Sequence, residues 1–118
     1  MKNMKNTIKE DGFEGTLIKD NEQYTLIDNT MLQKMVVSKT ILKPGQKTNG
    51  HYHNDIEEVY IFQKGYGKIK VGDKIKEVKA GDVVIIPDGD FHRVYNGSDE
   101  EVFVFIAVFN DKRKLNKR

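Results

Sequence analysis

All three histidines of this 118-residue chain lie in two short blocks. His51 and His53 are two positions apart and precede the adjacent glutamates Glu57 and Glu58, whereas His92 belongs to a later block. Imidazole nitrogen and carboxylate oxygen are typical ligands of divalent transition metal ions. The residue types therefore predict a metal site made of nitrogen and oxygen ligands.

The spacing within these blocks limits how the side chains can meet. Residues two apart in a strand share a face, so His51 and His53 would present their rings to the same side. Glu57 and Glu58 are adjacent and must point to opposite faces, so only one of them can join the histidines, and the alternation does not decide which. His92 completes a set of three nitrogens and one oxygen if its strand lies beside the first block.

The composition excludes several kinds of site and argues against several kinds of partner. The chain has no cysteine, which excludes disulfides, thiolate nucleophiles and iron–sulfur clusters as intrachain chemistry. No apolar stretch approaches the ~20 residues that span a bilayer, and we expect a cytoplasmic protein without membrane contact. The net charge is +2, and because residues 111–118 contribute +4, the remainder carries about −2. This balance argues against nucleic-acid binding.

The pattern of apolar residues predicts an all-β protein. Ranges rich in Val, Ile, Phe and Tyr are separated by turn residues, and Gly72-Asp73 is typical of a hairpin. We expect about ten short strands, which form a sandwich or barrel, in a single domain over residues 1–118 with a polar lead at about 1–12 and a basic tail at 111–118. The clearest strands are 34–42, 57–63, 67–71, 74–78, 83–86 and 101–109, and a further strand carries His92.

The first histidine block resembles a motif of the cupin superfamily. That motif runs Gly, five residues, His-x-His, three or four residues, Glu, six residues, Gly. Here Gly45, His51, His53, Glu58 and Gly65 keep these spacings. The resemblance selects Glu58 over Glu57 by its distance to Gly65.

The second block resembles the other cupin motif, which runs Gly, five residues, Pro-x-Gly, two residues, His, three residues, Asn. Gly81, Pro87, Gly89, His92 and Asn96 match each position. The two motifs cover residues 45–96, so the chain resembles a small single-domain cupin with one metal ion.

The resemblance implies a double-stranded β-helix, a jelly-roll barrel, with the ion inside one mouth. It implies that His51, His53, Glu58 and His92 bind one divalent ion, which can be Fe, Mn, Ni, Zn, Co or Cu. The glycines of the motifs would supply turns that need a positive φ. Four protein ligands leave two octahedral positions open for a small-molecule ligand or water.

The resemblance favours a metalloenzyme acting on a small polar metabolite, with sugar or sugar-phosphate isomerase-like chemistry. An iron-dependent dioxygenase and a non-catalytic metal-binding or metabolite-binding module are the alternatives. Tyr60 shares the face of Glu58 and is the candidate catalytic residue, as an acid/base or as a partner for a substrate hydroxyl. We expect no second carboxylate or histidine that could form an acid/base pair in the site. We also expect a homodimer that pairs through an edge strand or an apolar outer face, because an open sheet edge invites association.

Overall fold

The described part of the chain consists of ten β-strands joined by turns and short loops. The computed structural model describes residues 7–51 and 54–110, and within these ranges every regular element is a strand, which confirms the all-β prediction. No helix among these residues is long and apolar enough to cross a membrane. The strands are β1 (Thr7–Glu10), β2 (Phe13–Asp20), β3 (Tyr24–Asn29), β4 (Met35–Leu42), β5 (Glu58–Lys64), β6 (Tyr66–Val71), β7 (Lys74–Lys79), β8 (Val83–Ile86), β9 (His92–Asn96) and β10 (Phe103–Asn110).

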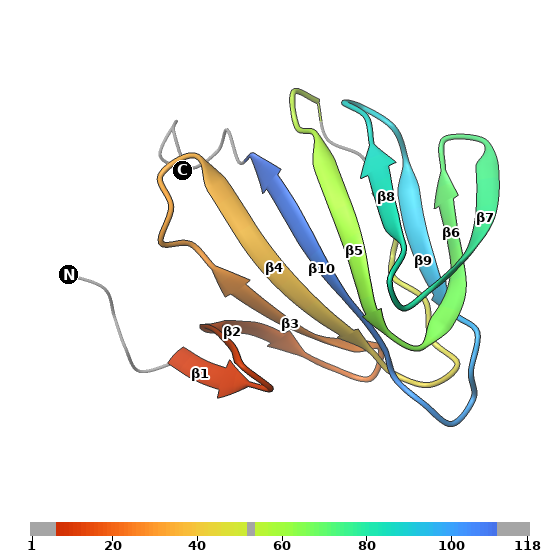
Figure 1. Cartoon of the computed structure of the whole chain (residues 1–118), viewed down its shortest axis with the longest axis horizontal. Helices are drawn as coiled ribbons and strands as arrows, with labels where there is room; N and C mark the ends of the chain where they lie inside the picture. Colours follow the sequence, from red (N-terminus) through yellow and green to blue (C-terminus); the bar gives the residue numbers. More distant parts are fainter. Residues whose placement is uncertain (1–6, 52–53, 111–118) are drawn as a thin grey trace.

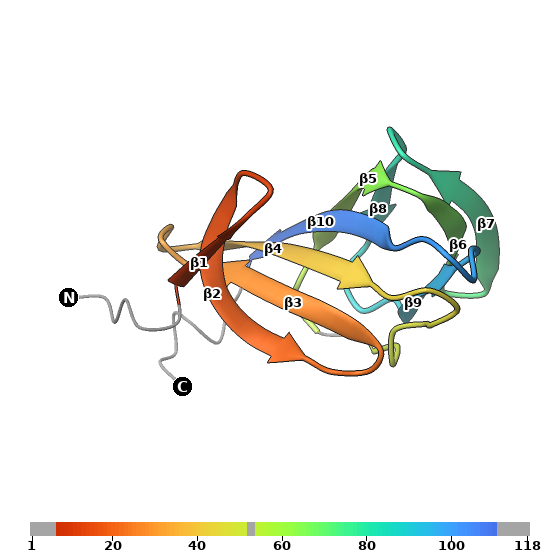
Figure 2. The ribbon, with the colours of Figure 1, turned by 90° about the horizontal axis from the view of Figure 1, so that it is seen from below.

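The strands form two antiparallel sheets. The large sheet has the order β1-β2-β3-β4-β10-β5-β8, and the small sheet has the order β7-β6-β9. In Figure 1 the small sheet lies on the side of β5 and β8, and Figure 2 shows the large sheet curving away towards β1 and β2 at the opposite end. Consecutive strands β5 and β6 belong to different sheets, so the chain changes sheet at Gly65.

The core lies between the two sheets and is rich in aromatic rings. Tyr60 stacks on Phe105 with ring centroids 4.8 Å apart, and Phe62 stacks on Phe103 at 5.0 Å. The small sheet contributes buried residues to the same cluster, among them Ile69. Stacked aromatic pairs add to the stabilisation from apolar burial alone. The stacked rings belong to β5 and β10 of the large sheet, and the small sheet packs on the same cluster through residues such as Ile69.

The strands beyond residue 33 match the sequence pattern closely. Each of the six ranges predicted there corresponds to an observed strand, with ends that differ by at most two residues, and β9 is the strand expected around His92. The pattern does not anticipate β1, β2 and β3, and β1 lies inside the stretch expected to be a polar lead. Half or more of the residues of β1 and β2 are exposed, so these two strands lack the apolar alternation that marks a half-buried strand.

The β1–β2 hairpin covers part of the outer face of the large sheet. Gly15 approaches β3 so closely that a Cβ there would lie 2.6 Å from the Asp28 carbonyl oxygen and 2.9 Å from the Ile27 side chain. Lys39 of β4 is buried, and its Nζ lies 2.5 Å from Glu10 Oε1. A buried ammonium requires such a partner. The hairpin thus packs closely on β3 and gives the buried Lys39 of β4 its counter-charge.

Gly65 is expected to tolerate a side chain far less well than Gly81. Both have a positive φ, which costs about 1–2 kcal/mol for a residue with a Cβ. At Gly65 the added Cβ would also lie 2.7 Å from the Val102 carbonyl oxygen, whereas at Gly81 it would meet nothing within 4 Å. Overpacking of this kind adds about 1–3 kcal/mol. Urea unfolding should therefore show a larger loss of stability for Gly65→Ala than for Gly81→Ala, and equal losses would contradict this account.

Candidate metal centre

Glu58 projects into the interior from the first position of β5. Alternation along this strand buries Glu58, Tyr60 and Phe62, while Glu57 is exposed just before the strand. The fold therefore decides which of the two adjacent glutamates faces the histidines. The expectation that Tyr60 shares the face of Glu58 is confirmed, since both are buried on the inner side.

His92 lies at the start of β9 and is almost completely buried. Its Nδ1 lies 3.1 Å from the Asp90 carbonyl oxygen, an acceptor that places the ring proton on Nδ1 and leaves the lone pair on Nε2. Nε2 lies 2.9 Å from Glu58 Oε1, but the two groups are not oriented for a hydrogen bond, so this buried nitrogen has no hydrogen-bond partner among the described residues. Metal-binding histidines in proteins commonly have their other ring nitrogen bonded to a carbonyl oxygen in this way.

His51 reaches the same point from a loop, and the expectation that it lies in a strand is wrong. It forms an isolated antiparallel bridge with His92, with backbone hydrogen bonds of 3.2 Å and 3.0 Å in the two directions. The two imidazole rings meet edge to face with centroids 4.5 Å apart. The expectation that the His92 strand lies beside the first block is therefore confirmed. His53 lies outside the described residues.

The three side chains form a compact cluster of potential metal ligands. One ligand atom each from His51, Glu58 and His92 lies within 4.8 Å of the other two. Two imidazole nitrogens and one carboxylate oxygen suit a divalent transition metal ion, and a shared ion would satisfy the unpaired Nε2 of His92. These residues fit the metal that the sequence predicts, and that they bind it stays a prediction.

The surroundings in the cluster shift the pKa values of two side chains, His92 and Tyr60. Burial is the largest single influence on the pKa of His92 and by itself would lower it. Glu58 and Asp90 together raise the pKa by more, so the pKa of His92 lies above its ordinary value. The pKa of Tyr60 lies well above its ordinary value, first because the ring is buried and second because Glu58 repels a phenolate. Tyr60 therefore stays protonated at neutral pH and can donate a hydrogen bond or a proton, but cannot act as a base.

The cluster opens into a cavity of about 420 Å³ enclosed by the large sheet and the loop before His51. One part of the lining is apolar and includes Tyr60, Phe105 and Phe109. The other part is polar and consists of Asp28, Ser38, Thr40, Thr48 and Asn49, with Lys19 among the lining residues. A pocket with these two sides suits a ligand that carries several hydroxyl groups.

Asp28 is a site residue that the sequence analysis missed. Asp28 lines the cavity and accepts a 2.6 Å hydrogen bond from the Ser38 hydroxyl, so a second carboxylate lies in the cavity. Strand pairing places Asp28, Ser38, Ala107 and Tyr60 in one row across the sheet. The alternation of Tyr24, Leu26 and Asp28 was the available signal, but it is recognised only once β3 is known to be a strand.

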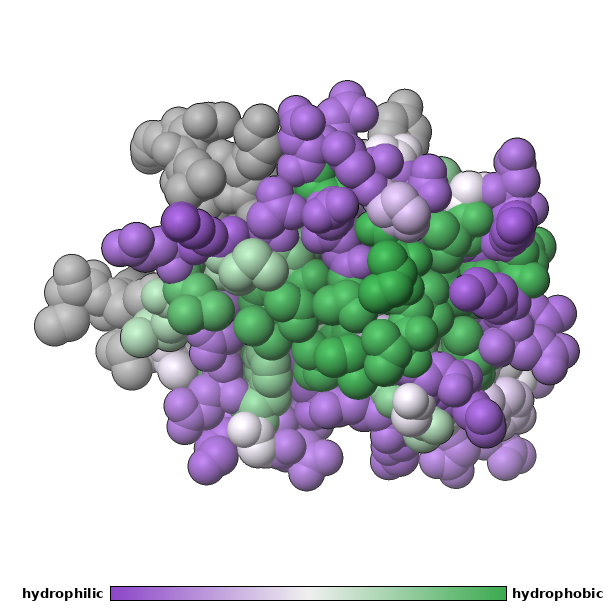
Figure 3. All heavy atoms as spheres, turned by 45° about the horizontal axis from the view of Figure 1, so that its top comes forward, coloured by the Kyte–Doolittle hydropathy of each residue, from purple (hydrophilic) through white to green (hydrophobic). Residues whose placement is uncertain are grey.

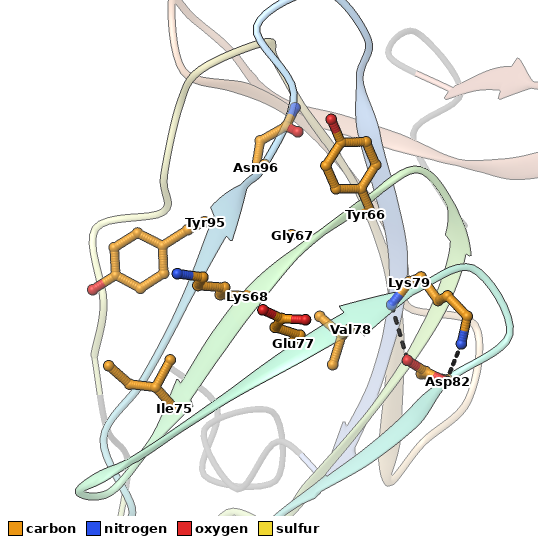
Figure 4. A pocket seen from close by; sticks show the side chains of 11 residues that line it. Tyr66, Gly67, Lys68, Ile75, Glu77, Val78, Lys79, Asp82, Tyr95 and Asn96 are labelled. Carbon is orange, nitrogen blue, oxygen red and sulfur yellow. Dashed lines mark hydrogen bonds and ion pairs between the residues drawn. The ribbon is translucent and has the colours of Figure 1, made fainter.

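A second hollow, of about 1100 Å³, lies on the other side of the small sheet (Figure 4). Tyr66, Lys68 and Tyr95 line it together with Glu77, and Lys79 forms an ion pair with Asp82 at its edge. It contains no histidine and none of the three clustered ligands. His51 and Glu58 line the smaller cavity instead.

Comparison with known proteins agrees with this geometry. The cupin domain family model matches residues 38–109, more than half of the chain, and the chain belongs to this family. The double-stranded β-helix fold is shared with a cupin 2 conserved barrel domain protein of Salinispora arenicola, which has a TM-score of 0.70 and 25% identity over 86% of this chain and 87% of that one. A predicted oxalate decarboxylase of Thermotoga maritima has a TM-score of 0.68 and 25% identity over 74% and 79% of the two chains.

The curated relatives are longer proteins. A glucose-6-phosphate isomerase of Pyrococcus abyssi is 36% identical over 83 residues, which cover 59% of this chain and 43% of the isomerase. The chain spans about half, or less, of the length of the curated relatives it matches.

Glu58→Gln is expected to lower metal affinity by more than about 100-fold, because even residues that only support metal ligands contribute about 10- to 100-fold. The adjacent Glu57→Gln is the matched control and should leave metal binding unchanged, since Glu57 is exposed before the strand. Elemental analysis of protein purified without added metal, followed by titration with Zn(II) or Co(II), measures both. Equal affinities in the two variants would show that Glu58 is not a ligand.

Metal binding and the stability of the metal-free protein are expected to respond to pH in opposite directions. Protons compete with a metal for His92, so affinity should fall as the pH falls through the raised pKa. In the metal-free protein, protonated His92 beside Glu58 stabilises the fold below the ordinary pKa of about 6.5, and this contribution is lost as the pH rises through the raised pKa. Calorimetric titration and urea unfolding between pH 5 and 8 test this, and curves that move together would refute it.

Proposed function

We propose that this cupin is a metal-dependent enzyme that acts on a small polyhydroxylated metabolite, with sugar or sugar-phosphate isomerase-like chemistry. The observation that carries the proposal is the unpaired, buried Nε2 of His92 beside Glu58 and His51, at a cavity with a hydroxyl-rich wall. A divalent ion held by these residues, with His53 as the expected fourth ligand, would polarise a carbonyl or hydroxyl oxygen of the ligand.

The polar wall is suited to holding the ligand at a distance from the metal ligands. Asp28 and Tyr60 lie in one row but are separated by two intervening strands, or about 14 Å along the curved sheet. Ser38 donates to Asp28, so a carboxylate oxygen is held in place as an acceptor for a ligand hydroxyl. Lys19 at the same cavity gives a cation for a phosphate group. A ligand of sugar size can therefore contact both walls.

Tyr60 supplies the proton-bearing group. Its raised pKa keeps the hydroxyl protonated, and its ring is fixed by Phe105 on one side and lies edge to face with His92 at 5.7 Å. A hydroxyl held this way donates to an oxygen that becomes more negative during the reaction. Similarity to the glucose-6-phosphate isomerase of Pyrococcus abyssi supports sugar phosphates as the first substrates to test.

The test is an aldose–ketose interconversion assay of the full chain, loaded with each candidate metal, on a panel of sugars and sugar phosphates. We expect conversion by the metal-loaded protein and a loss of about 10²- to 10⁴-fold in kcat/KM for Tyr60→Phe, which removes the donor but keeps the ring. Tyr95→Phe, a change at a tyrosine that lines the other hollow, is the matched control and should retain full activity.

Two further measurements separate the alternatives. Asp28→Asn should raise KM or the ligand Kd while metal content stays unchanged, because Asp28 lies outside the ligand cluster. Oxygen uptake by the Fe(II)-loaded protein with a bound metabolite would instead favour the dioxygenase. Tight binding of a sugar without conversion under any metal would favour the non-catalytic module.

A further inference from the structure

The loop that carries His51 runs beside β9 and changes its register by one residue on the way. Lys47 lies opposite Tyr95, whereas His51 lies opposite His92. Three loop residues, 48–50, therefore lie opposite only two residues of β9. This arrangement is a β-bulge, in which one strand contributes an extra residue and the side chains that follow are aimed differently.

The bulge decides on which side of β9 the His51 side chain lies. In a regular strand Lys47 and His51, four residues apart, would share a face. Their partners Tyr95 and His92 are three apart and point to opposite faces of β9. Tyr95 lines the outer hollow of the small sheet (Figure 4), and His92 is buried near Glu58. Because a slip of one residue turns a side chain to the other face, His51 would point away from the cluster if the extra residue were absent.

The side chain of Arg93 holds the bulge from the outer face of β9. Its Nη2 donates a 2.6 Å hydrogen bond to the Asn49 carbonyl oxygen, and its guanidinium lies 5.6 Å from the centre of the Phe91 ring. A neutral donor, Gln23 Nε2, bonds the Lys47 carbonyl oxygen at 3.1 Å, before the bulge. Hydrogen bonds from charged donors are about twice as strong as neutral ones, so Arg93 makes the stronger contact, and it makes it at the bulge itself.

Gly50 lets the loop approach this guanidinium closely. Its φ is +77°, and an added Cβ would lie 2.6 Å from Phe91 Cζ and 2.9 Å from Arg93 Nε. A glycine in the left-handed conformation is a usual component of a β-bulge. The bulge is therefore packed directly against the side chains of Phe91 and Arg93.

We propose that Arg93 is a positioning residue for the metal centre, which locks the bulge at residues 48–50 and so turns His51 towards His92 and Glu58. The inference rests on the metal function proposed above and adds to it a residue outside the ligand cluster. Arg93 follows His92 directly in β9 and points to the opposite face, so it acts on the metal centre only through the loop.

The first test follows the loop without any metal. Amide hydrogen exchange of the metal-free full chain reports the hydrogen bond from the His51 N–H to the His92 carbonyl oxygen. Arg93→Met keeps an unbranched side chain but removes the charged donor, and it should speed exchange at His51 by about 10-fold or more. Lys70→Met is the matched control, because Lys70 also lies over the Phe91 ring, at 5.9 Å, but belongs to β6. Equal exchange at His51 in the two variants would overturn the proposal.

The second test measures metal binding in a double-mutant cycle. Arg93→Met should lower the affinity for Co(II) by about 10- to 100-fold, the usual effect of losing a residue that orients a metal ligand. The visible absorption spectrum of the bound Co(II) should then resemble that of the His51→Ala protein. In the His51→Ala background, Arg93→Met should change the affinity by less than about 2-fold. The same loss with and without His51 would indicate a merely structural role and overturn the proposal.

A second variant and the wild type make each result decisive. Circular dichroism checks folding, and Gly50→Ala strains the bulge from the loop side, so it should also speed exchange at His51 and weaken Co(II) binding. Wild-type values for both measurements in Gly50→Ala would overturn the proposal. A wild type that binds no Co(II) would refute the metal function and this inference together. Equally tight binding by the wild type and Arg93→Met would refute the inference alone.

Discussion

The buried approach of Glu58 to His92 is the contact on which the site depends. Glu58 belongs to the large sheet and His92 to the small one, so this 2.9 Å contact exists only when the two sheets close on each other. Removing a carboxylate and an imidazole from water is costly unless each gains a partner. The His51–His92 bridge and the Asp90 carbonyl hold the imidazole in position, and the unpaired Nε2 leaves room for an ion to be the missing partner.

The same strand carries both the site and the core. Along β5 the inward side chains change from Glu58 through Tyr60 to Phe62, and Phe62 packs against Phe103 and Phe105. The aromatic end contributes to the core between the sheets, while the other end places Glu58 in a largely buried environment. A low local dielectric strengthens the electrostatic interactions there, as the raised pKa of Tyr60 illustrates. The stretch of β5 from Glu58 to Phe62 therefore contributes both to the core and to the candidate site.

The two faces of the large sheet differ in chemical character. The inner face of β3, β4, β10 and β5 lines the cavity beside His51, and the outer face of β4, β10, β5 and β8 is apolar (Figure 3). Because alternate residues of a strand point to opposite faces, Val59 and Ile61 lie on the outer face while Glu58 and Tyr60 face the cavity. Substitutions on one face are for this reason expected to affect the other only weakly.

Local patterns in the sequence were sufficient to predict the all-β class and most strands beyond residue 33, because alternation is a property of neighbouring residues. The spacing of the two motifs also singled out His51, Glu58 and His92, which the fold brings together. Three features required the tertiary structure. The strands between Thr7 and Asn29 lack a clear local pattern, because the packing of β1 and β2 on the outer face of β3 and β4 buries residues that look polar or isolated in the sequence. Asp28 enters the cavity only because β3 pairs with β4 in a register that places it beside Ser38. His51 meets His92 across 41 positions of sequence, a contact that closure of the barrel produces and that no local pattern contains.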